Sequence, residues 1–362
     1  MKQSLIESHA AMQQAFASGL ERLLLQPGLG SYILVHANAS FDAEIYRSLK
    51  SQLARRFDQQ AEYCRLTLSE GRELVGAADD NLVFLKLMAI GFDGVHAAEF
   101  RDEADWELQF NHIRAFRPSR MTSEPALGIS RPFDPNGFHF NKPFLRREAF
   151  WAGDLHGVEV ELMYNKFPFV PMHCLLVPDR TQRLPQLLTR KYHDYVWELV
   201  DRLCSGLPGV GIAYNSFAAF ASVNHLHFQL FIRPKPLPLM RDHWRHNGGE
   251  RDYPLNCEIY ESAAEAWQRI ESLHRSEVSY NLVYQPGRLY CIPRKRQGSY
   301  EHQPWTRGFA WYELAGGFTT FSRSDFDTLD ADAITRELVK LRPESVGSGQ
   351  PVDQVVETKP LR

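Results

Sequence analysis

Three polar side chains alternate with large apolar ones in the segment SVNHLHFQLFI, which spans residues 222–232. Successive side chains of a β-strand point to opposite faces, so we expect His225, His227 and Gln229 on one face and the apolar residues on the other. An apolar face of this kind packs into a core. The alternation therefore predicts a strand that holds two imidazoles and an amide close enough to share one ligand.

Three kinds of chemistry could use this polar face. A metal site is one, but Gln229 is a poor ligand and at least one further His, Asp, Glu or Cys is needed. An anion site is the second, with imidazolium and amide groups donating to phosphate. Covalent catalysis is the third, because a neutral imidazole is nucleophilic near pH 7 and can form a phosphoramidate. The segment alone leaves all three open.

The composition narrows the class of protein. With 362 residues, 44% of them hydrophobic and 23% charged, the chain is typical of a soluble globular protein with one or two domains. A net charge of −3 gives no overall attraction for nucleic acid or for an anionic membrane. No signal sequence and no run of about 18 apolar residues is present, so we expect neither standard secretion nor a membrane span.

The cysteines indicate a compartment. Five are present, widely scattered and without a CxxC pair. This pattern argues against a disulfide framework and against a thiolate zinc site, and it favours the cytoplasm.

Periodicity predicts the elements around the alternating segment. Helical spacing predicts helices over 4–25, 41–57, 188–204 and 261–275. Strands are expected at SYILVHA (31–37), at 158–162, 173–178, 280–285 and 288–293, and at FAWYEL (309–314), and a turn followed by a strand is expected in GLPGVGIAYNSF (206–217). Periodicity does not settle the type of the apolar segment 81–92. Residues 113–150 are rich in Pro, Arg and Phe, which is typical of a long ordered connection that could line the site.

The sequence around the alternating segment resembles a known signature. GIAYNSFAAFASVNHLHFQLF is similar to the histidine-triad superfamily, in the branch of nucleotidyltransferases and phosphorylases in which glutamine replaces the last histidine. Within that branch, YNS, FAS and NHLHFQ most resemble the GDP-L-galactose and GDP-D-glucose phosphorylases. PFDPNGFHFNK (132–142), NKFPFVPMHCLLVP (165–178) and AWYELAGGFT (310–319) extend the resemblance.

One of these segments also resembles a second kind of enzyme. NKFP followed by PGH is usual in diadenosine tetraphosphate phosphorylase, and Met172 stands here where the glycine is typical. A dinucleoside polyphosphate phosphorylase or adenylyltransferase is therefore the alternative among enzymes. A metal-binding protein and a non-catalytic nucleotide-binding protein are the alternatives outside that class.

The resemblance implies a role for each polar residue. It implies that His227 attacks the α-phosphorus to form a nucleotidyl-histidine, with its other ring nitrogen donating to a backbone carbonyl. It implies that His225 supports the phosphate or the leaving group and that Gln229 bonds to phosphate oxygens. The implied substrate- or phosphate-binding residues are Asn215, Ser216, Asn224, Lys166, His173, Arg294 and Lys295. Ordinary turn, strand or surface roles are the alternative for this second set.

The resemblance also implies a fold and a reaction. The fold is α+β, of the galactose-1-phosphate uridylyltransferase type, with antiparallel sheets, packed helices and two related lobes. The expected parts are an N-terminal mixed α/β region (1–112), a catalytic lobe (113–235), a second lobe (236–342) and a flexible tail (343–362). The implied reaction is phosphorolysis of a nucleoside diphosphate hexose, with GDP-hexose as the expected substrate. The implied partners are the nucleotide sugar, inorganic phosphate and a second copy in a homodimer; no metal or other cofactor is implied.

Overall fold

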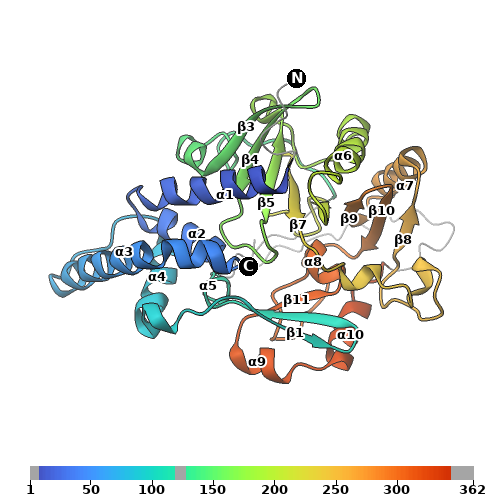
Figure 1. Cartoon of the computed structure of the whole chain (residues 1–362). Helices are drawn as coiled ribbons and strands as arrows, with labels where there is room; N and C mark the ends of the chain where they lie inside the picture. The colour runs from blue at the N-terminus through green and yellow to red at the C-terminus, as the bar shows by residue number, and fades with distance from the viewer. Residues whose placement is uncertain (1–7, 119–127, 344–362) are drawn as a thin grey trace, which may run out of the picture.

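The computed structural model describes residues 8–118 and 128–343, and within them it shows an α+β fold built on two sheets (Figure 1). The predicted tail falls outside these residues, except for its first position. The α+β class with antiparallel strands and packed helices is confirmed.

The larger sheet has eight strands in the order β3-β4-β5-β7-β6-β9-β10-β8, and every neighbouring pair is antiparallel. Its strands are β3 Ala149–Leu155, β4 Val158–Tyr164, β5 Cys174–Pro178, β6 Val210–Asn215, β7 Phe228–Ile232, β8 Glu258–Tyr260, β9 Ser279–Gln285 and β10 Arg288–Arg294. Strand β7 is central, and its Gln229 lies between Leu175 of β5 and Ala213 of β6.

The two faces of β7 pack into two different cores. Phe228, Leu230 and Ile232 join the core beneath helices α6 Arg190–Leu203 and α7 Ala263–Arg275. Phe231, on the opposite face, joins a second core that includes Trp311. The predicted alternation is therefore confirmed within the strand. The face that carries Gln229 is also buried, because the second core packs on it.

The smaller sheet contains three strands, β1 Glu99–Glu103, β2 Trp106–Phe110 and β11 Gly317–Thr320. It packs with the short helices α8 Trp311–Leu314, α9 Arg323–Thr328 and α10 Ala331–Val339. A buried ion pair ties the two sheets together, because Nη1 and Nη2 of Arg233 each lie 3.0 Å from an oxygen of Glu107. The Tyr312 hydroxyl donates to the same carboxylate at 2.8 Å, so both charges are partnered.

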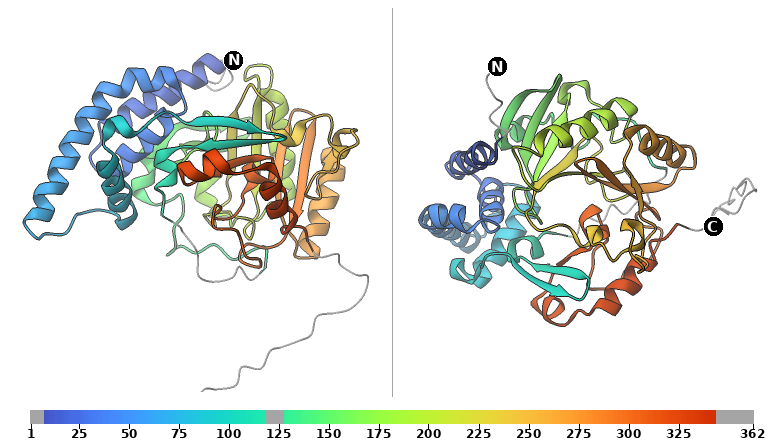
Figure 2. Two further views of the ribbon diagram at one scale, coloured as in Figure 1. Left: turned by 90° about the horizontal axis from the view of Figure 1, so that it is seen from below. Right: turned by 45° about the vertical axis from the view of Figure 1, so that its right-hand side comes forward.

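The N-terminal helices lie to one side of the sheets, and the far end of α3 projects away from them (Figures 1 and 2). They are α1 His9–Leu24, α2 Leu29–Ala39, α3 Ala43–Ser69, α4 Ala78–Ile90 and the single turn α5 His112–Ala115. Helix α1 contacts the larger sheet through Phe16, whose ring packs edge-on against Phe150 and Tyr164.

Two predicted strands are wrong. SYILVHA belongs to helix α2, in which residues 31–39 are all buried among α1, α3 and α4. A short apolar run has the same periodicity in a buried helix as in a buried strand, and burial on all sides decided for the helix. FAWYEL contains the turn α8, where a carboxylate oxygen of Glu313 accepts from the backbone N–H of Ala310 and so caps the helix. The undecided segment 81–92 contains most of helix α4.

The predicted lobe boundary near residue 235 falls inside one sheet. Strand β6 lies before it and β9 after it, and the two pair directly from Ile212↔Tyr284 to Asn215↔Asn281. The division into lobes stays a prediction.

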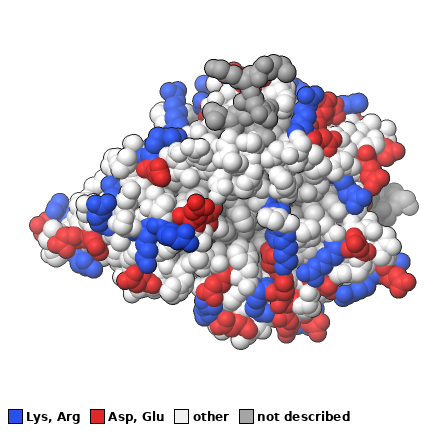
Figure 3. Space-filling model, viewed as in Figure 1, with Lys and Arg blue, Asp and Glu red and all other residues white. Residues whose placement is uncertain are grey.

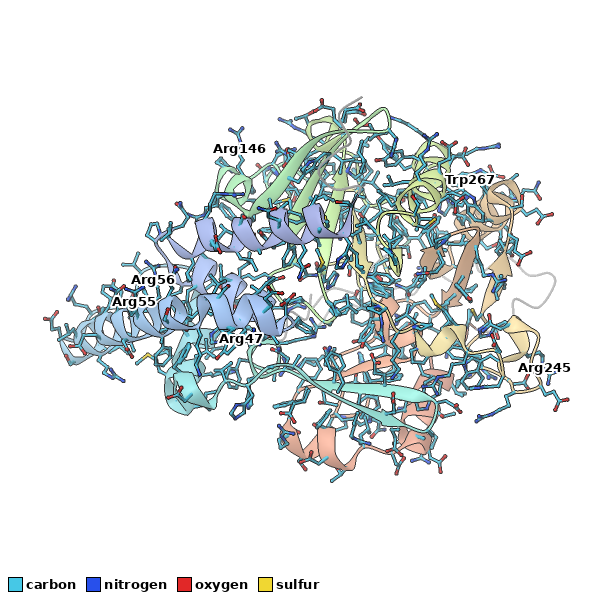
Figure 4. The ribbon with its side chains drawn as sticks, viewed as in Figure 1. Arg47, Arg55, Arg56, Arg146, Arg245 and Trp267 are labelled. Atoms are coloured by element: carbon cyan, nitrogen blue, oxygen red, sulfur yellow. The ribbon has the colours of Figure 1, made fainter. Side chains whose placement is uncertain are left out.

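Charge is mixed on the face shown in Figure 3, where both signs surround a largely uncharged centre. Arg55, Arg56, Arg146 and Arg245 lie at the periphery of the ribbon, away from β7 (Figure 4). Within the described residues, no helix combines the length and apolarity needed to cross a membrane. All five cysteines are free thiols.

Candidate active site

Residues 225–227 form the end of the loop that leads into β7. The predicted strand over 222–232 is therefore too long, since the strand begins only at Phe228. The backbone N–H of Leu226 donates to the carbonyl of Leu184 at 2.9 Å, and that of His227 donates to Oε1 of Gln186 at 2.9 Å. Because both N–H groups bond to residues outside the sheet, strand pairing starts only at the next residue, Phe228.

The ring of His227 has a fixed tautomer. Its Nδ1 lies 2.8 Å from the carbonyl oxygen of His225, and a carbonyl can only accept, so Nδ1 carries the hydrogen. Nε2 then holds the lone pair, and no residue within the described ranges hydrogen-bonds to it. Burial lowers the pKa of His227 to about 4, so the imidazole is neutral at pH 7. The predicted bond to a backbone carbonyl is thus present, and the carbonyl is that of His225.

The ring of His225 is bonded at both nitrogens. Nδ1 accepts from the backbone N–H of Phe140 at 3.2 Å, and Nε2 donates to the carbonyl of Arg180 at 3.1 Å. Burial, and then the proximity of His227, lower its pKa to about 4. Both nitrogens thus have partners within the protein, and the expected phosphate contact of His225 stays a prediction. The backbone carbonyl of His225 orients His227.

The side-chain oxygen of Gln229 accepts two hydrogen bonds. One comes from Nε1 of Trp311 at 2.7 Å and the other from Nε2 of His173 at 2.9 Å. Burial lowers the pKa of His173 to about 3, so this ring is also neutral near pH 7. The structure therefore brings the predicted His173 beside Gln229, and it adds Trp311.

Sequence reasoning missed Gln186. This side chain is almost fully buried, and its Nε2 donates to the carbonyls of Asn215 at 2.9 Å and of His227 at 3.1 Å. Together with the bond from the His227 N–H, these contacts clamp the end of β6 to the start of β7. Gln186 lies in a Pro-containing connection, where neither its residue type nor its spacing indicates a role at the site.

Sequence reasoning also missed Trp311. Its indole stacks on Phe231 with ring centroids 4.8 Å apart and an interplanar angle of 14°. Trp311 lies in AWYELAGGFT, one of the segments that resemble the phosphorylases. Because a strand was predicted there, the direction of the indole could not be predicted. The helical turn α8 aims Nε1 at Gln229.

Asn215, Ser216 and Asn224 all bond to backbone close to the site. Oδ1 of Asn215 accepts from the Trp311 N–H at 3.1 Å, and Oγ of Ser216 accepts from the Tyr280 N–H at 3.1 Å. Oδ1 of Asn224 accepts from the Gln186 N–H at 3.1 Å. These side chains hold together the loops that carry the histidines, and their predicted contact with substrate stays a prediction.

The predicted cationic residues have partners in the protein. Lys166 lies 2.5 Å from a carboxylate oxygen of Asp80 on α4. Arg294 is 1% exposed, and its guanidinium donates to the carbonyl of Phe309 and, at 2.7 Å, to the Tyr300 hydroxyl. Neither side chain shares a hydrogen bond with the histidines or Gln229. Lys295 follows Arg294 at the end of β10, and its backbone N–H donates to Leu341.

Met172, just before His173, has a φ of 47°. Positive φ is the conformation that favours glycine, which explains the glycine usual at this place in the similar motif. For the metal alternative, the described residues contain no group of three or more His, Cys, Asp or Glu side chains placed to hold an ion.

Residues 101–231 match the family described as GDPGP1-like, N-terminal domain. GDP-D-glucose phosphorylase 1 of Danio rerio is 35% identical over 119 residues, which is 33% of this chain and 34% of that protein. The human protein of the same name is 34% identical over 127 residues, 33% and 32% of the two chains. GDP-L-galactose phosphorylase 1 of Arabidopsis thaliana is 35% identical over 75 residues, 21% and 16% of the two chains.

These alignments span about a third or less of the relatives' length. The predicted resemblance to the GDP-hexose phosphorylases is confirmed for the part of the chain that contains HLHFQ. Among solved structures, the yeast Ap4A phosphorylase Apa2 in complex with Ap4A is similar at 17% identity with a TM-score of 0.46, covering 75% of this chain and 100% of that one.

Proposed function

We propose that this protein is a phosphorylase that cleaves a GDP-hexose with inorganic phosphate through a nucleotidyl-histidine. The observation that carries the proposal is the state of His227, a neutral imidazole whose Nδ1–H donates to the His225 carbonyl at 2.8 Å. That bond leaves the Nε2 lone pair as the nucleophile and holds its direction. The substrate class comes from the names of the similar proteins, GDP-D-glucose phosphorylase 1 and GDP-L-galactose phosphorylase 1.

In the first step, Nε2 of His227 attacks the α-phosphorus of the GDP-hexose. A P–N bond forms, and the bond from this phosphorus to the bridging oxygen breaks, with the electron pair leaving on hexose 1-phosphate. The imidazole gains positive charge as it becomes guanylylated. The Nδ1–H bond to the His225 carbonyl strengthens with that charge, so it stabilises the intermediate more than the free enzyme.

In the second step, an oxygen of inorganic phosphate attacks the same phosphorus. The P–N bond breaks, its electron pair returns to Nε2, and GDP leaves. Gln229 donates to the phosphate oxygens in both steps, and Gln186 keeps the His227 backbone in place. We also propose that the enzyme acts in the cytoplasm as a homodimer, and that it needs no metal. Substrate contacts of Asn215, Ser216, Asn224, Lys166, Arg294 and Lys295 stay predictions.

The test is a panel of substrates incubated with and without phosphate. GDP-glucose, GDP-L-galactose, UDP-glucose, ADP-glucose and diadenosine tetraphosphate are compared, and the nucleotide products are separated. We expect GDP and hexose 1-phosphate from the GDP-hexoses, and only when phosphate is present. Faster formation of ADP from diadenosine tetraphosphate would favour the dinucleoside polyphosphate phosphorylase instead, and nucleotide binding without turnover would favour a binding protein.

The intermediate can be trapped in the same assay. With GDP-hexose labelled at the α-phosphate and no inorganic phosphate, a labelled protein should accumulate. Its bond should be labile in acid and stable in alkali, as expected of a phosphoramidate. A bond stable in acid would point to a nucleophile other than histidine.

A further inference from the structure

The amide of Gln229 can face its neighbours in only one orientation. The indole Nε1–H of Trp311 can only donate, and it lies 2.7 Å from the amide oxygen. His173 is a donor as well. Its Nδ1 accepts from the Phe169 N–H at 3.4 Å, and its Nε2 lies closer to the Gln229 oxygen, at 2.9 Å, than to Nδ2 of Asn165, at 3.4 Å, so the hydrogen is on Nε2. With the amide turned over, its NH₂ group would face two N–H groups. The oxygen is thus held inward and the NH₂ group outward.

Both donors are themselves held in place. Trp311 and His173 are each 0% exposed. The indole stacks on Phe231, and the Trp311 backbone N–H donates to Oδ1 of Asn215 at 3.1 Å. The ring of Phe169 packs edge-on against His173 with centroids 4.2 Å apart. Rotating the Gln229 amide would therefore leave two buried donors without an acceptor, which is costly.

The outward end of the amide has no partner of its own. Gln229 is 9% exposed, and within the described ranges no residue hydrogen-bonds to its Nε2. Gln229 is two residues after His227, the proposed nucleophile. The NH₂ group can donate to a phosphate oxygen, whereas the amide oxygen already accepts from two donors.

We propose that Trp311 and His173 are positioning residues that hold the Gln229 amide so that it offers only N–H to the reacting phosphate, and that this decides between phosphorolysis and hydrolysis. The proposal rests on the proposed function and deepens it. Phosphate arrives as an anion and can attack without losing a proton. Water forms the same O–P bond and breaks the same P–N bond, but it must also pass a proton to an acceptor. An amide oxygen is too weakly basic to take that proton, which passes to solvent, but turned outward it could accept a hydrogen bond from the attacking water and orient it. The two donors that hold the oxygen inward prevent this.

The test is Trp311→Phe, which removes one N–H and keeps an aromatic ring to stack on Phe231. GMP and GDP formed from GDP-hexose are measured at saturating phosphate, with kcat and KM. We expect the GMP to GDP ratio to rise at least about tenfold and kcat for GDP formation to fall by about tenfold, with KM within about threefold. Trp305→Phe is the matched control, because the Trp305 ring packs against Phe309 nearby and its indole has no hydrogen bond to a described residue.

His173 gives an independent pair of variants. His173→Gln can place an amide N–H near the position of Nε2, so it should keep the product ratio close to that of the wild type. His173→Leu offers no donor and should raise the GMP fraction as Trp311→Phe does. The two His173 variants also test the positioning proposal if Trp311→Phe does not fold, which thermal unfolding would show.

The possible outcomes separate the two proposals. If the wild type makes GDP but the variants slow both products equally, Trp311 and His173 are structural only and the positioning proposal is overturned. An equal rise in GMP for Trp305→Phe would overturn it as well. If the wild type makes no GDP from GDP-hexose and phosphate, the proposed function itself fails, and the positioning proposal fails with it.

Discussion

The two histidines of the loop before β7 differ in charge and in partners from the cationic residues that were predicted to bind phosphate. His225 and His227 are neutral, and backbone groups orient their rings. Lys166 and Arg294 are cations that already have partners, Lys166 in a carboxylate and Arg294 in a carbonyl and a hydroxyl. The proposed nucleophile and its neighbour are thus neutral, whereas Lys166 and Arg294 are paired with other groups of the protein.

Burial explains this difference. A buried charge is costly unless it is paired, whereas a neutral imidazole or amide needs only its hydrogen bonds. The same burial keeps the pKa of His227 at about 4, so the proposed nucleophile needs no base to deprotonate it at pH 7. The predictions below test whether chemistry and charge are separated in this way.

The largest effect is expected from His227→Ala. The substitution deletes the covalent route, so we expect kcat/KM to fall by at least about 10⁴-fold. The labelled intermediate should also disappear, because both ring nitrogens of His225, the other histidine of the loop, are already hydrogen-bonded. Circular dichroism and thermal unfolding report whether the variant is folded. Residual activity within tenfold of the wild type would show that the nucleophile lies elsewhere.

The alternation of residues 228–232 could be predicted because period two is a local property of a strand. The start of β7 could not, because it depends on a bond between His227 and Gln186, 41 residues away in the chain. The turn α8 was mistaken for a strand for a similar reason, since Trp311 and Tyr312 are buried by contacts distant in sequence.

The residue types of the site could also be predicted, but their partners could not. The resemblance carried by HLHFQ implied a nucleophilic His227 with a carbonyl partner, and the structure identifies the carbonyl as that of His225. No pattern pointed to Gln186 or to the direction of the Trp311 indole, because a lone glutamine or tryptophan has no spacing to interpret. The same holds for the charged residues: a lysine or arginine is visible in the sequence, but its partner in the fold is not.

The second prediction concerns acid. Burial lowers the pKa of His36 and His173 to about 3, and of His225 and His227 to about 4, against about 6.5 in the unfolded chain. As the pH falls below about 6.5, the unfolded chain binds protons that the folded chain does not. The unfolding free energy therefore falls with pH, and His36 alone should account for on the order of 2 kcal/mol between pH 7 and pH 5.

Urea unfolding of His36→Phe at pH 7 and pH 5 measures this contribution. His36 stacks on Tyr46 and Phe92, so phenylalanine can keep the ring contacts without titrating. Between pH 7 and pH 5, the unfolding free energy of the variant should fall by about 2 kcal/mol less than that of the wild type. Substitution of the exposed His9 by glutamine is the control and should change nothing. Equal losses in wild type and His36→Phe would contradict the prediction.

The third prediction separates the two histidines of the loop. His225→Ala keeps the carbonyl that orients His227 but leaves the Phe140 N–H and the Arg180 carbonyl without their partner. We expect kcat to fall by about 10²-fold through displacement of that carbonyl, which is far less than for His227→Ala. The intermediate should still form, only more slowly. A loss as large as that of His227→Ala would mean that His225 takes part in the chemistry.

The smallest effect is expected at Lys166. It tests most directly whether the paired cations take part in substrate binding or only in the fold. Lys166 and Asp80 have side chains that are only 27% and 15% exposed, so each depends on the other. If the pair serves the fold alone, Lys166→Met should leave KM for phosphate and for GDP-hexose within about threefold and should lower the unfolding free energy by about 1 kcal/mol. Asp80→Asn should behave alike, and the double variant should show a coupling energy of similar size in urea unfolding. The opposite outcome would be a rise in KM of more than tenfold for Lys166→Met with none for Asp80→Asn. That result would mean that Lys166 leaves Asp80 for the substrate, and that charge does take part at this site.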